Sequence, residues 1–216
     1  MTHSHNRIIL WRHGQTDWNV ENRFQGHSDI ALNSVGQFQV KHAAPLIAQM
    51  KPTKIISSDL GRAVNTAKAL SLLVNLEIQI DERLRETNGG NWEGKTGAEN
   101  RAEDYERFVN WLDGTDEPAG QTGERRSEIA ERAVNAITSA LTIDVSTLIV
   151  VTHGGTARCI LGKMLEMPMT QWSSIGGLSN ASWSILESGH HRDGWVLVEH
   201  NAGSLPEPIY GEESGA

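Results

Sequence analysis

Cysteine, long apolar runs and an excess of basic residues are scarce or missing in this chain of 216 residues. Its single cysteine, Cys159, cannot form a disulfide within the chain, and the first residues lack the basic flank and apolar run of a secretory signal. No apolar run approaches the roughly 20 residues that span a bilayer. The formal net charge of −8 comes from 27 acidic and 19 basic residues, which argues against a nucleic-acid-binding surface. We therefore expect a cytoplasmic protein that binds neither nucleic acid nor membrane.

Several catalytic signatures are also absent. The chain contains no Walker A loop, no Gly-x-Gly-x-x-Gly, no Gly-x-Ser-x-Gly and no His-Glu-x-x-His, and no carboxylate cluster shows metal-ligand spacing. Cys159 lacks the flanking loop of a cysteine phosphatase and falls within a predicted helix, so we interpret it as an unreactive core thiol. We accordingly predict no metal and no cofactor.

Apolar runs and helical periodicity alternate along much of the chain. Short apolar runs predict strands at 8–11, 54–57, 76–80 and 147–152, with two late strands near 182–186 and 195–200. Helical spacing predicts a helix over 34–50, opened by a Ser34-x-x-Gln37 capping box, and further helices after 58–59, around 129–141 and up to about 165. Strand–helix alternation implies right-handed crossovers. We predict an α/β three-layer sandwich, with a mostly parallel central sheet flanked by helices.

A polar stretch from Asp81 to Gln121 interrupts this alternation, and it carries one predicted helix around Glu99 to Leu112. About 40 residues with few aliphatic side chains cannot build a core of their own. We therefore expect an insertion at about 87–121 that lies over the active-site edge of the sheet, within one domain spanning 1–200. Residues 201–216 contain three glutamates and no basic residue, which predicts a flexible acidic tail.

Two strands end in the same kind of polar cluster, WRHG around His13 and THGG around His153. Ligands of open α/β sheets bind outside the carboxyl ends of the strands, so two such histidines meet if their strands are neighbours. A third strand leads to Arg62 in the first turn of a helix, and a fourth leads to Glu86. Taken alone, the Arg12–His13 pair also fits a buried strand whose loop merely contains a histidine.

This set of side chains suits a phosphate group. Arginine pairs bidentately with phosphate oxygens, and helix N–H groups favour negative charge. A histidine among arginines loses basicity, and a neutral imidazole can attack phosphorus, while a carboxylate supplies the proton transfers. Glu86 is the favoured carboxylate, with Glu82 and Glu93 as nearby alternatives. Arg83 and Arg85 are expected at the surface or behind the site, and the alternative for either is contact with a substrate carboxylate.

Four motifs in the same order and register, WRHGQTDWN, SSDLGRA, LRETNGGNWEG and THGG, resemble the histidine phosphatase superfamily, the phosphoglycerate mutase-like fold. The resemblance runs from about Arg7 to Glu199. It implies that His13 is the phosphorylated nucleophile and Glu86 the proton donor. It places the remaining predicted residues in the phosphate pocket: Arg12, Arg62, His153, Asn19, Gln25, Gly26 and Gly154.

Within the superfamily, LRETNGGNWEG resembles phosphatases more than mutases, and the acidic tail would repel a phosphorylated substrate. A narrower resemblance, of WRHGQTDWN together with IGGLSNASW (175–183), is to glucosyl-3-phosphoglycerate phosphatases. One departure is Thr122-Gly123-Glu124-Arg125, where many relatives have Gly-Gly-Glu-Ser. The implied activity is hydrolysis of a small-molecule phosphate ester, glucosyl-3-phosphoglycerate, to glucosylglycerate, without a metal. The alternatives are a broad-specificity or α-ribazole-type phosphatase, a cofactor-dependent phosphoglycerate mutase and an inactive phosphate-binding module. A homodimer is left open.

Overall fold

A six-stranded sheet forms the centre of the computed structural model, which describes residues 6–188 and 194–203. The strand order is β3-β2-β4-β1-β5-β6. Strands β1 to β4 run parallel, and β5 and β6 are antiparallel to their neighbours. The predicted mostly parallel sheet is therefore confirmed. The strands are β1 (Arg7–Arg12), β2 (Lys54–Ser57), β3 (Ile78–Ile80), β4 (Thr147–Thr152), β5 (Trp183–Ser188) and β6 (Trp195–Ala202).

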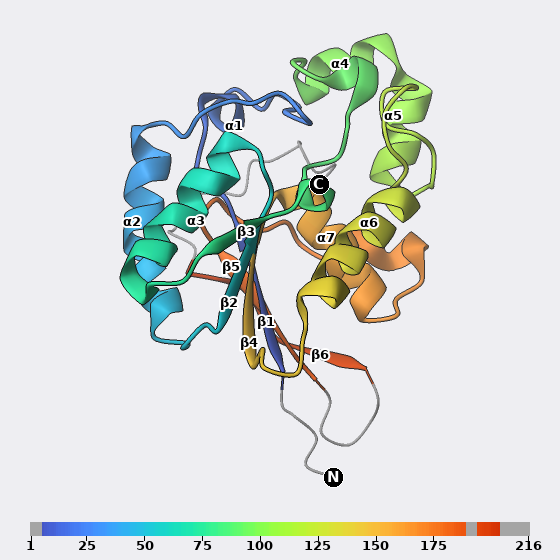
Figure 1. The fold of residues 1–216 in the computed structure, drawn as a ribbon. Helices are drawn as coiled ribbons and strands as arrows, with labels where there is room; N and C mark the ends of the chain where they lie inside the picture. Colours follow the sequence, from blue (N-terminus) through green and yellow to red (C-terminus); the bar gives the residue numbers. More distant parts are fainter. Residues whose placement is uncertain (1–5, 189–193, 204–216) are drawn as a thin grey trace.

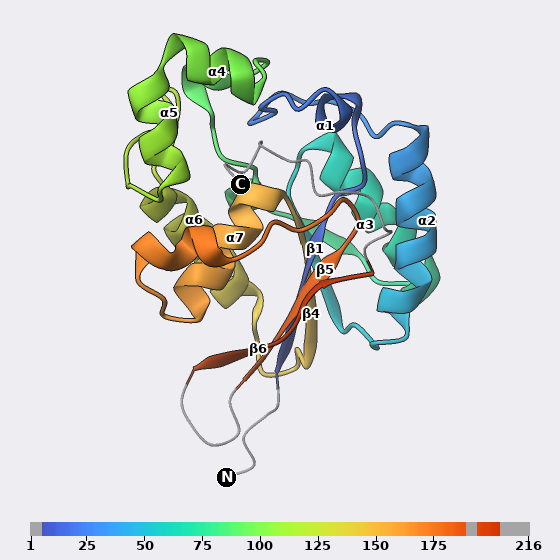
Figure 2. The ribbon, with the colours of Figure 1, turned by 180° about the vertical axis from the view of Figure 1, so that it is seen from behind.

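Helices cover both faces of this sheet. Figures 1 and 2 show α2 (Ser34–Ala48) and α3 (Gly61–Val74) on one side, and α6 (Arg126–Ala140) and α7 (Gly154–Met164) on the other. This arrangement is the predicted three-layer α/β sandwich. The shorter helical elements are α1 (Asp17–Val20), η1 (Glu82–Leu84), η2 (Gly90–Trp92), α4 (Gly97–Glu103), α5 (Tyr105–Leu112) and η3 (Met169–Ser174).

The core divides into two layers because successive strand residues point to opposite faces. In β1, Ile8 and Leu10 join the cluster under α6 and α7, whereas Ile9 and Trp11 join the cluster under α2 and α3. All four side chains are fully buried. A strand buried on both faces reads as a continuous apolar run, which is why β1 and β4 were readily predicted.

The ends of two predicted elements differ from the structure. Helix α2 is capped by Asn33, whose side chain accepts a hydrogen bond from the Gly36 amide at 2.8 Å, so the predicted Ser34–Gln37 capping box is wrong. Strand β3 begins at Ile78, and the prediction from residue 76 was too long. The Leu76 carbonyl accepts from Ser71 Oγ at 2.6 Å, which ties this residue to the end of α3.

The insertion contains two helices, α4 and α5, so the single helix predicted over Glu99–Leu112 is wrong. Asp104 separates them with φ −143° and ψ 56°, which no helix accommodates. The Trp92 ring packs edge to face with Phe108, at a centroid distance of 5.3 Å, and with Trp111, at 5.8 Å. The same cluster includes residues of α6, α7 and η3. The insertion has few aliphatic side chains, and its aromatic side chains supply most of the apolar surface that it buries. This surface packs on the main domain.

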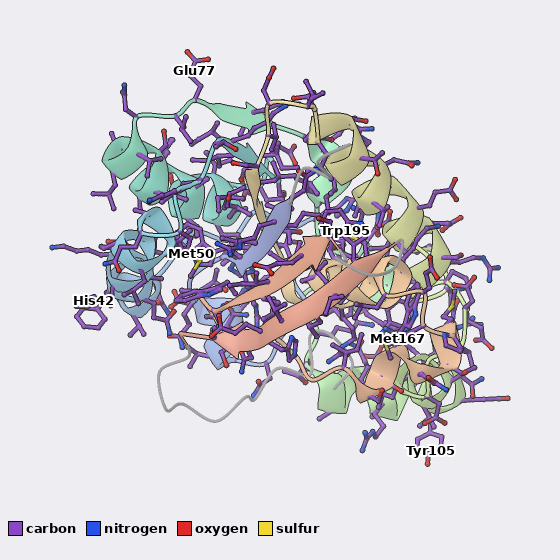
Figure 3. All side chains as sticks on the ribbon, turned by 90° about the horizontal axis from the view of Figure 1, so that it is seen from below. His42, Met50, Glu77, Tyr105, Met167 and Trp195 are labelled. Carbon is purple, nitrogen blue, oxygen red and sulfur yellow. The ribbon has the colours of Figure 1, made fainter. Side chains whose placement is uncertain are left out.

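The last strand reaches further than predicted. β6 continues through Ala202, so the first two residues of the predicted tail lie in the sheet, whereas 204–216 are outside the described residues. Figure 3 shows the side chains of His42, on α2, and Tyr105, at the start of α5, extending outward on opposite sides of the molecule. In the described part of the chain, no helix has the length and apolarity needed to cross a membrane.

Candidate active site

His13 lies directly after β1, at the carboxyl edge of the parallel strands, and its side chain is buried. Its Nδ1 atom is 2.7 Å from the carbonyl oxygen of Gly14. A carbonyl oxygen can only accept, so Nδ1 carries the proton and Nε2 keeps its lone pair. The His13 carbonyl accepts from the Ala181 amide at 3.0 Å and from Asn180 Nδ2 at 3.2 Å. The hydrogen bond from Nδ1 to the Gly14 carbonyl therefore holds the ring in the tautomer that leaves Nε2 nucleophilic.

Two arginines lie beside His13. Arg62 is in the first turn of α3, as predicted, and is fully buried. Its Nη1 and Nη2 atoms donate to the carbonyls of Ser28 and Gly26, at 2.7 and 2.9 Å. Arg12 is also buried and donates from Nη1 to the Leu178 carbonyl at 2.6 Å. Backbone carbonyls thus orient both guanidinium groups.

His153 is the N-cap residue of α7 and is completely buried. Its Nδ1 atom accepts from Arg62 Nε at 3.2 Å, which requires the proton on Nε2, and Nε2 lies 2.9 Å from Ser58 Oγ. The rings of His13 and His153 are 5.1 Å apart, centroid to centroid. Strands β1 and β4 are neighbours, which is the condition under which the two histidines were predicted to meet.

Both histidines are held neutral by their surroundings. Burial lowers the pKa of His13 well below its usual 6.5, and the charges of Arg62 and then Arg12 lower it further. Burial also lowers the pKa of His153 well below 6.5, with additional contributions from Arg62, His13 and Arg12. A buried imidazole beside fixed positive charge binds a proton poorly.

Glu86 lies between η1 and η2, and its buried carboxylate meets the first turn of α7. Its Oε1 atom accepts from the Thr87 amide at 2.8 Å, from the Thr156 amide at 3.0 Å and from Thr156 Oγ1 at 3.2 Å. Its Oε2 atom accepts from the Gly155 amide at 3.1 Å. The amino terminus of a helix attracts negative charge. The carboxylate is therefore fixed beside the same helix that His153 caps.

The two alternative carboxylates are placed differently. Glu93 accepts from the His27 and Gly89 amides, at 3.0 and 3.1 Å, and from Ser28 Oγ at 3.1 Å, so it fastens two loops together. Glu82 is exposed at the start of η1. Of the three carboxylates, Glu86 is the one bound to α7 beside the histidines.

The other residues predicted for the pocket lie around this cluster. Asn19 Oδ1 accepts from the Thr16 amide at 2.9 Å and from Asn180 Nδ2 at 3.1 Å. Gln25 is buried next to Gly26, whose carbonyl holds Arg62. Gly154 opens α7, and a Cβ atom built there would lie 3.4 Å from Arg12 Nε. The roles assigned to these residues stay predictions.

Arg83 and Arg85 pair with acidic neighbours, as expected for residues at the surface or behind the site. Arg83 Nη2 is 2.7 Å from Asp81 Oδ2, and Arg85 Nε is 2.8 Å from Asp59 Oδ1. Within residues 6–188 and 194–203, no group of three or more histidine, cysteine, aspartate or glutamate side chains could hold a metal ion.

Several supporting residues were not identified from the sequence. Thr156 and Gly155 bind Glu86, Ser58 binds His153, and Asn180 bridges the His13 carbonyl and Asn19. Each of these residues adjoins or lies within a motif that had been noted. Their contact partners come from distant segments, so sequence spacing could not reveal the contacts.

The sequence profile of the histidine phosphatase superfamily (branch 1) matches residues 8–203. Glucosyl-3-phosphoglycerate phosphatase from Mycobacterium tuberculosis is 35% identical over 198 residues, covering 87% of each chain. Probable phosphoglycerate mutase GpmB from Proteus mirabilis is 34% identical over 195 residues, covering 88% of this chain and 90% of the relative.

Solved structures agree with these sequence relatives. A mycobacterial glucosyl-3-phosphoglycerate phosphatase in complex with VO3 superposes with a TM-score of 0.83 at 35% identity, covering 91% of this chain and 99% of that one. A further structure of that mycobacterial protein contains inorganic phosphate. The profile match over most of the chain, together with these relatives, places the chain in branch 1 of the histidine phosphatase superfamily.

Proposed function

We propose that this protein is a metal-independent phosphomonoesterase that forms a phosphohistidine intermediate on His13. The observation that carries the proposal is the bond from His13 Nδ1 to the Gly14 carbonyl, which leaves the Nε2 lone pair on a neutral ring beside two arginines. A phosphate dianion placed there would pair with Arg12 and Arg62, whose charges also stabilise the transition state.

The reaction proceeds in two balanced steps. Nε2 of His13 forms a bond to phosphorus as the bond from phosphorus to the alcohol oxygen breaks, and the Glu86 carboxyl gives its proton to that oxygen. Water then attacks phosphorus and gives a proton to the Glu86 carboxylate, while the nitrogen–phosphorus bond breaks. The products are the alcohol, inorganic phosphate and neutral His13.

For the physiological substrate we propose glucosyl-3-phosphoglycerate, which would be hydrolysed to glucosylglycerate. The proposal is supported by 35% identity to the mycobacterial phosphatase that carries this name. It is also supported by the segment 175–183, which contributes the Leu178 carbonyl that holds Arg12 and the Asn180 amide that holds His13. A segment so close to the reacting phosphate is well placed to contact the rest of the substrate.

The specific competing function is that of a phosphoglycerate mutase, because relatives with that name reach 34% identity over similar coverage. A mutase must protect its phosphohistidine from water until the phosphate returns to the substrate. Hydrolysis and isomerisation therefore differ in the fate of the same intermediate.

A substrate panel tests the proposal. Phosphate release would be measured with glucosyl-3-phosphoglycerate, 3-phosphoglycerate, an α-ribazole phosphate and p-nitrophenyl phosphate, each with and without EDTA. We expect the highest kcat/KM with glucosyl-3-phosphoglycerate and no effect of EDTA. Conversion of 3-phosphoglycerate to its isomer would favour the mutase, loss of activity in EDTA would contradict the metal-independent mechanism, and no turnover of any ester would indicate an inactive phosphate-binding module.

A further inference from the structure

Arg132, on α6, uses all five of its N–H donors around the segment that carries Glu86. Its Nη1 atom donates to the carbonyls of Arg83 and Arg85, at 2.7 and 2.8 Å. Its Nη2 atom donates to the carbonyl of Glu86 itself at 3.0 Å. The two remaining donors bind the Glu124 carboxylate, at 2.6 Å from Nε and 2.8 Å from Nη2. One guanidinium thus binds the backbone on the amino-terminal side of Glu86 and at Glu86 itself.

Glu124 binds the same segment on the other side of Glu86. Its Oε2 atom accepts from the Asn88 amide at 2.8 Å, and its own amide donates to the Asn88 carbonyl at 2.9 Å. The preceding residue must be small, because a Cβ atom on Gly123 would lie 2.1 Å from the Asn88 carbonyl oxygen. Together, Glu124 and Arg132 hold residues 83–88 from both sides.

The Glu86 carbonyl also connects this segment to the loop that holds Arg62. His27 Nε2 lies 3.0 Å from that carbonyl oxygen and donates to it, so the Glu86 carbonyl accepts from both His27 and Arg132. His27 follows Gly26, whose carbonyl accepts from Arg62. The backbone of Glu86 is therefore placed relative to the phosphate-binding arginine as well as to α6.

We propose that Glu124 and Arg132 are positioning residues for Glu86. The inference rests on the proposed proton-donor role of Glu86. Among the described residues, neither side chain is hydrogen-bonded to His13 or His153; both act by fixing the peptide that aims the Glu86 carboxylate at the first turn of α7. Proton transfer to the leaving oxygen requires that oxygen to be within hydrogen-bond reach, so a displaced peptide weakens catalysis while leaving the nucleophile in place.

These hydrogen bonds give Glu124 a structural role within the stretch 122–125. The departure noted there concerns Thr122 and Arg125, and Glu124 between them is unchanged. Arg125 is exposed and donates to the Asp116 carbonyl in the insertion, so this replacement is directed away from Glu86, and the Glu124–Arg132 pair is intact.

The test compares Arg132→Lys and Glu124→Gln with the wild type on phenyl phosphate and p-nitrophenyl phosphate. Lysine keeps the charge but cannot reproduce the planar five-donor fork of arginine. We expect kcat/KM for phenyl phosphate to fall about tenfold more than for p-nitrophenyl phosphate, because phenolate is the more basic leaving group and needs the proton more. The ratio kcat/KM is used because it reports the first phosphoryl transfer and not the later hydrolysis, which both substrates share.

A double-mutant cycle separates positioning from general destabilisation. In a Glu86→Gln background, Arg132→Lys is expected to cause no further leaving-group-dependent loss, because the group that it positions is gone. The matched control is Arg107→Lys, which perturbs a partly buried arginine paired with Asp104 and Glu117, each at 3.3 Å, on the insertion. This control should affect both substrates equally.

The outcomes distinguish the inference from the proposed function beneath it. Equal losses on the two substrates for Arg132→Lys, or an additive loss in the Glu86→Gln background, would overturn the positioning role. Equal losses for Glu86→Gln alone would overturn the proton-donor role and the inference with it. If Arg132→Lys does not fold, as judged by its melting temperature, Glu124→Gln provides the same comparison.

Discussion

The imidazole rings of His13 and His153 lie 5.1 Å apart at an interplanar angle of 59°, although they follow strands that are far apart in the sequence. Each has its Nδ1 atom engaged, by the Gly14 carbonyl for His13 and by Arg62 for His153. The two rings therefore have opposite tautomers, with the proton on Nδ1 of His13 and on Nε2 of His153. Only His13 has an Nε2 lone pair for attack on phosphorus.

Replacing His13 tests this assignment directly. We expect His13→Ala to lower kcat for p-nitrophenyl phosphate by at least about 10³-fold, because the variant lacks the imidazole that attacks phosphorus. Rapid quenching in alkaline denaturant, in which phosphohistidine is stable, should trap no acid-labile phosphoenzyme in this variant. His42→Ala, an exposed histidine on α2, serves as the control and should retain activity. Phosphoenzyme that persists in His13→Ala would exclude His13 as the nucleophile.

Gly155 offers a second way to move Glu86. A Cβ atom at Gly155 would lie 2.7 Å from Glu86 Oε1 and 3.1 Å from Thr87 Oγ1, so Gly155→Ala must displace the carboxylate from the amides of α7. We expect kcat/KM for phenyl phosphate to fall about tenfold, equivalent to about 1.4 kcal/mol, with a smaller loss for p-nitrophenyl phosphate. The same variant assayed on two leaving groups is its own control. An equal loss on both would show that Glu86 is not the group affected.

The two neutral histidines should make stability depend on pH. The pKa values of both histidines are lowered in the folded state. Below the unfolded value of about 6.5, the unfolded chain therefore binds protons that the folded chain does not bind. The free energy of unfolding should therefore fall as pH drops below about 6.5, by up to about 1.4 kcal/mol per pH unit for each histidine.

Urea unfolding between about pH 7.5 and 5.5 would measure this dependence. His13→Asn should reduce the slope of the unfolding free energy against pH by the equivalent of up to one bound proton. The same change at the exposed His42 should leave this slope unchanged. Identical slopes in wild type and His13→Asn would contradict the lowered pKa of His13.

Cys159 should be unreactive in the folded protein. It is buried in α7, and burial raises the pKa of its thiol to about 11, so the thiolate that reacts with disulfide reagents is scarce. We expect no reaction with dithionitrobenzoate near neutral pH and rapid reaction in urea. Fast reaction of the folded chain, accompanied by loss of activity, would assign the thiol a role that its environment does not support.

Local patterns predicted the central elements well because their physical signals are local. Strand β1 was predicted from a short apolar run, and the structure buries all of Ile8 to Trp11. A single helix was predicted around Glu99–Leu112, but Asp104 breaks it into two. In α5, Phe108 and Trp111 pack in one cluster with residues of α6 and α7, and such contacts lie outside any local window.

The sequence by itself determined which residues could form a phosphate pocket. His13 and Arg62 follow strands β1 and β2, and His153 follows β4. Parallel strands deliver the residues after them to one edge, so these three were expected to meet if their strands are neighbours, and the structure places β2, β4 and β1 side by side. Only the tertiary structure decided how each group is held. It sets the tautomer of His13, the four hydrogen bonds on the Glu86 carboxylate, and the hydrogen bonds from Arg132 and Glu124 to the backbone around Glu86. Apart from the bonds between the neighbours His13 and Gly14 and Glu86 and Thr87, these contacts join segments tens of residues apart, and they depend on how helices dock on the sheet, which spacing along the chain does not encode.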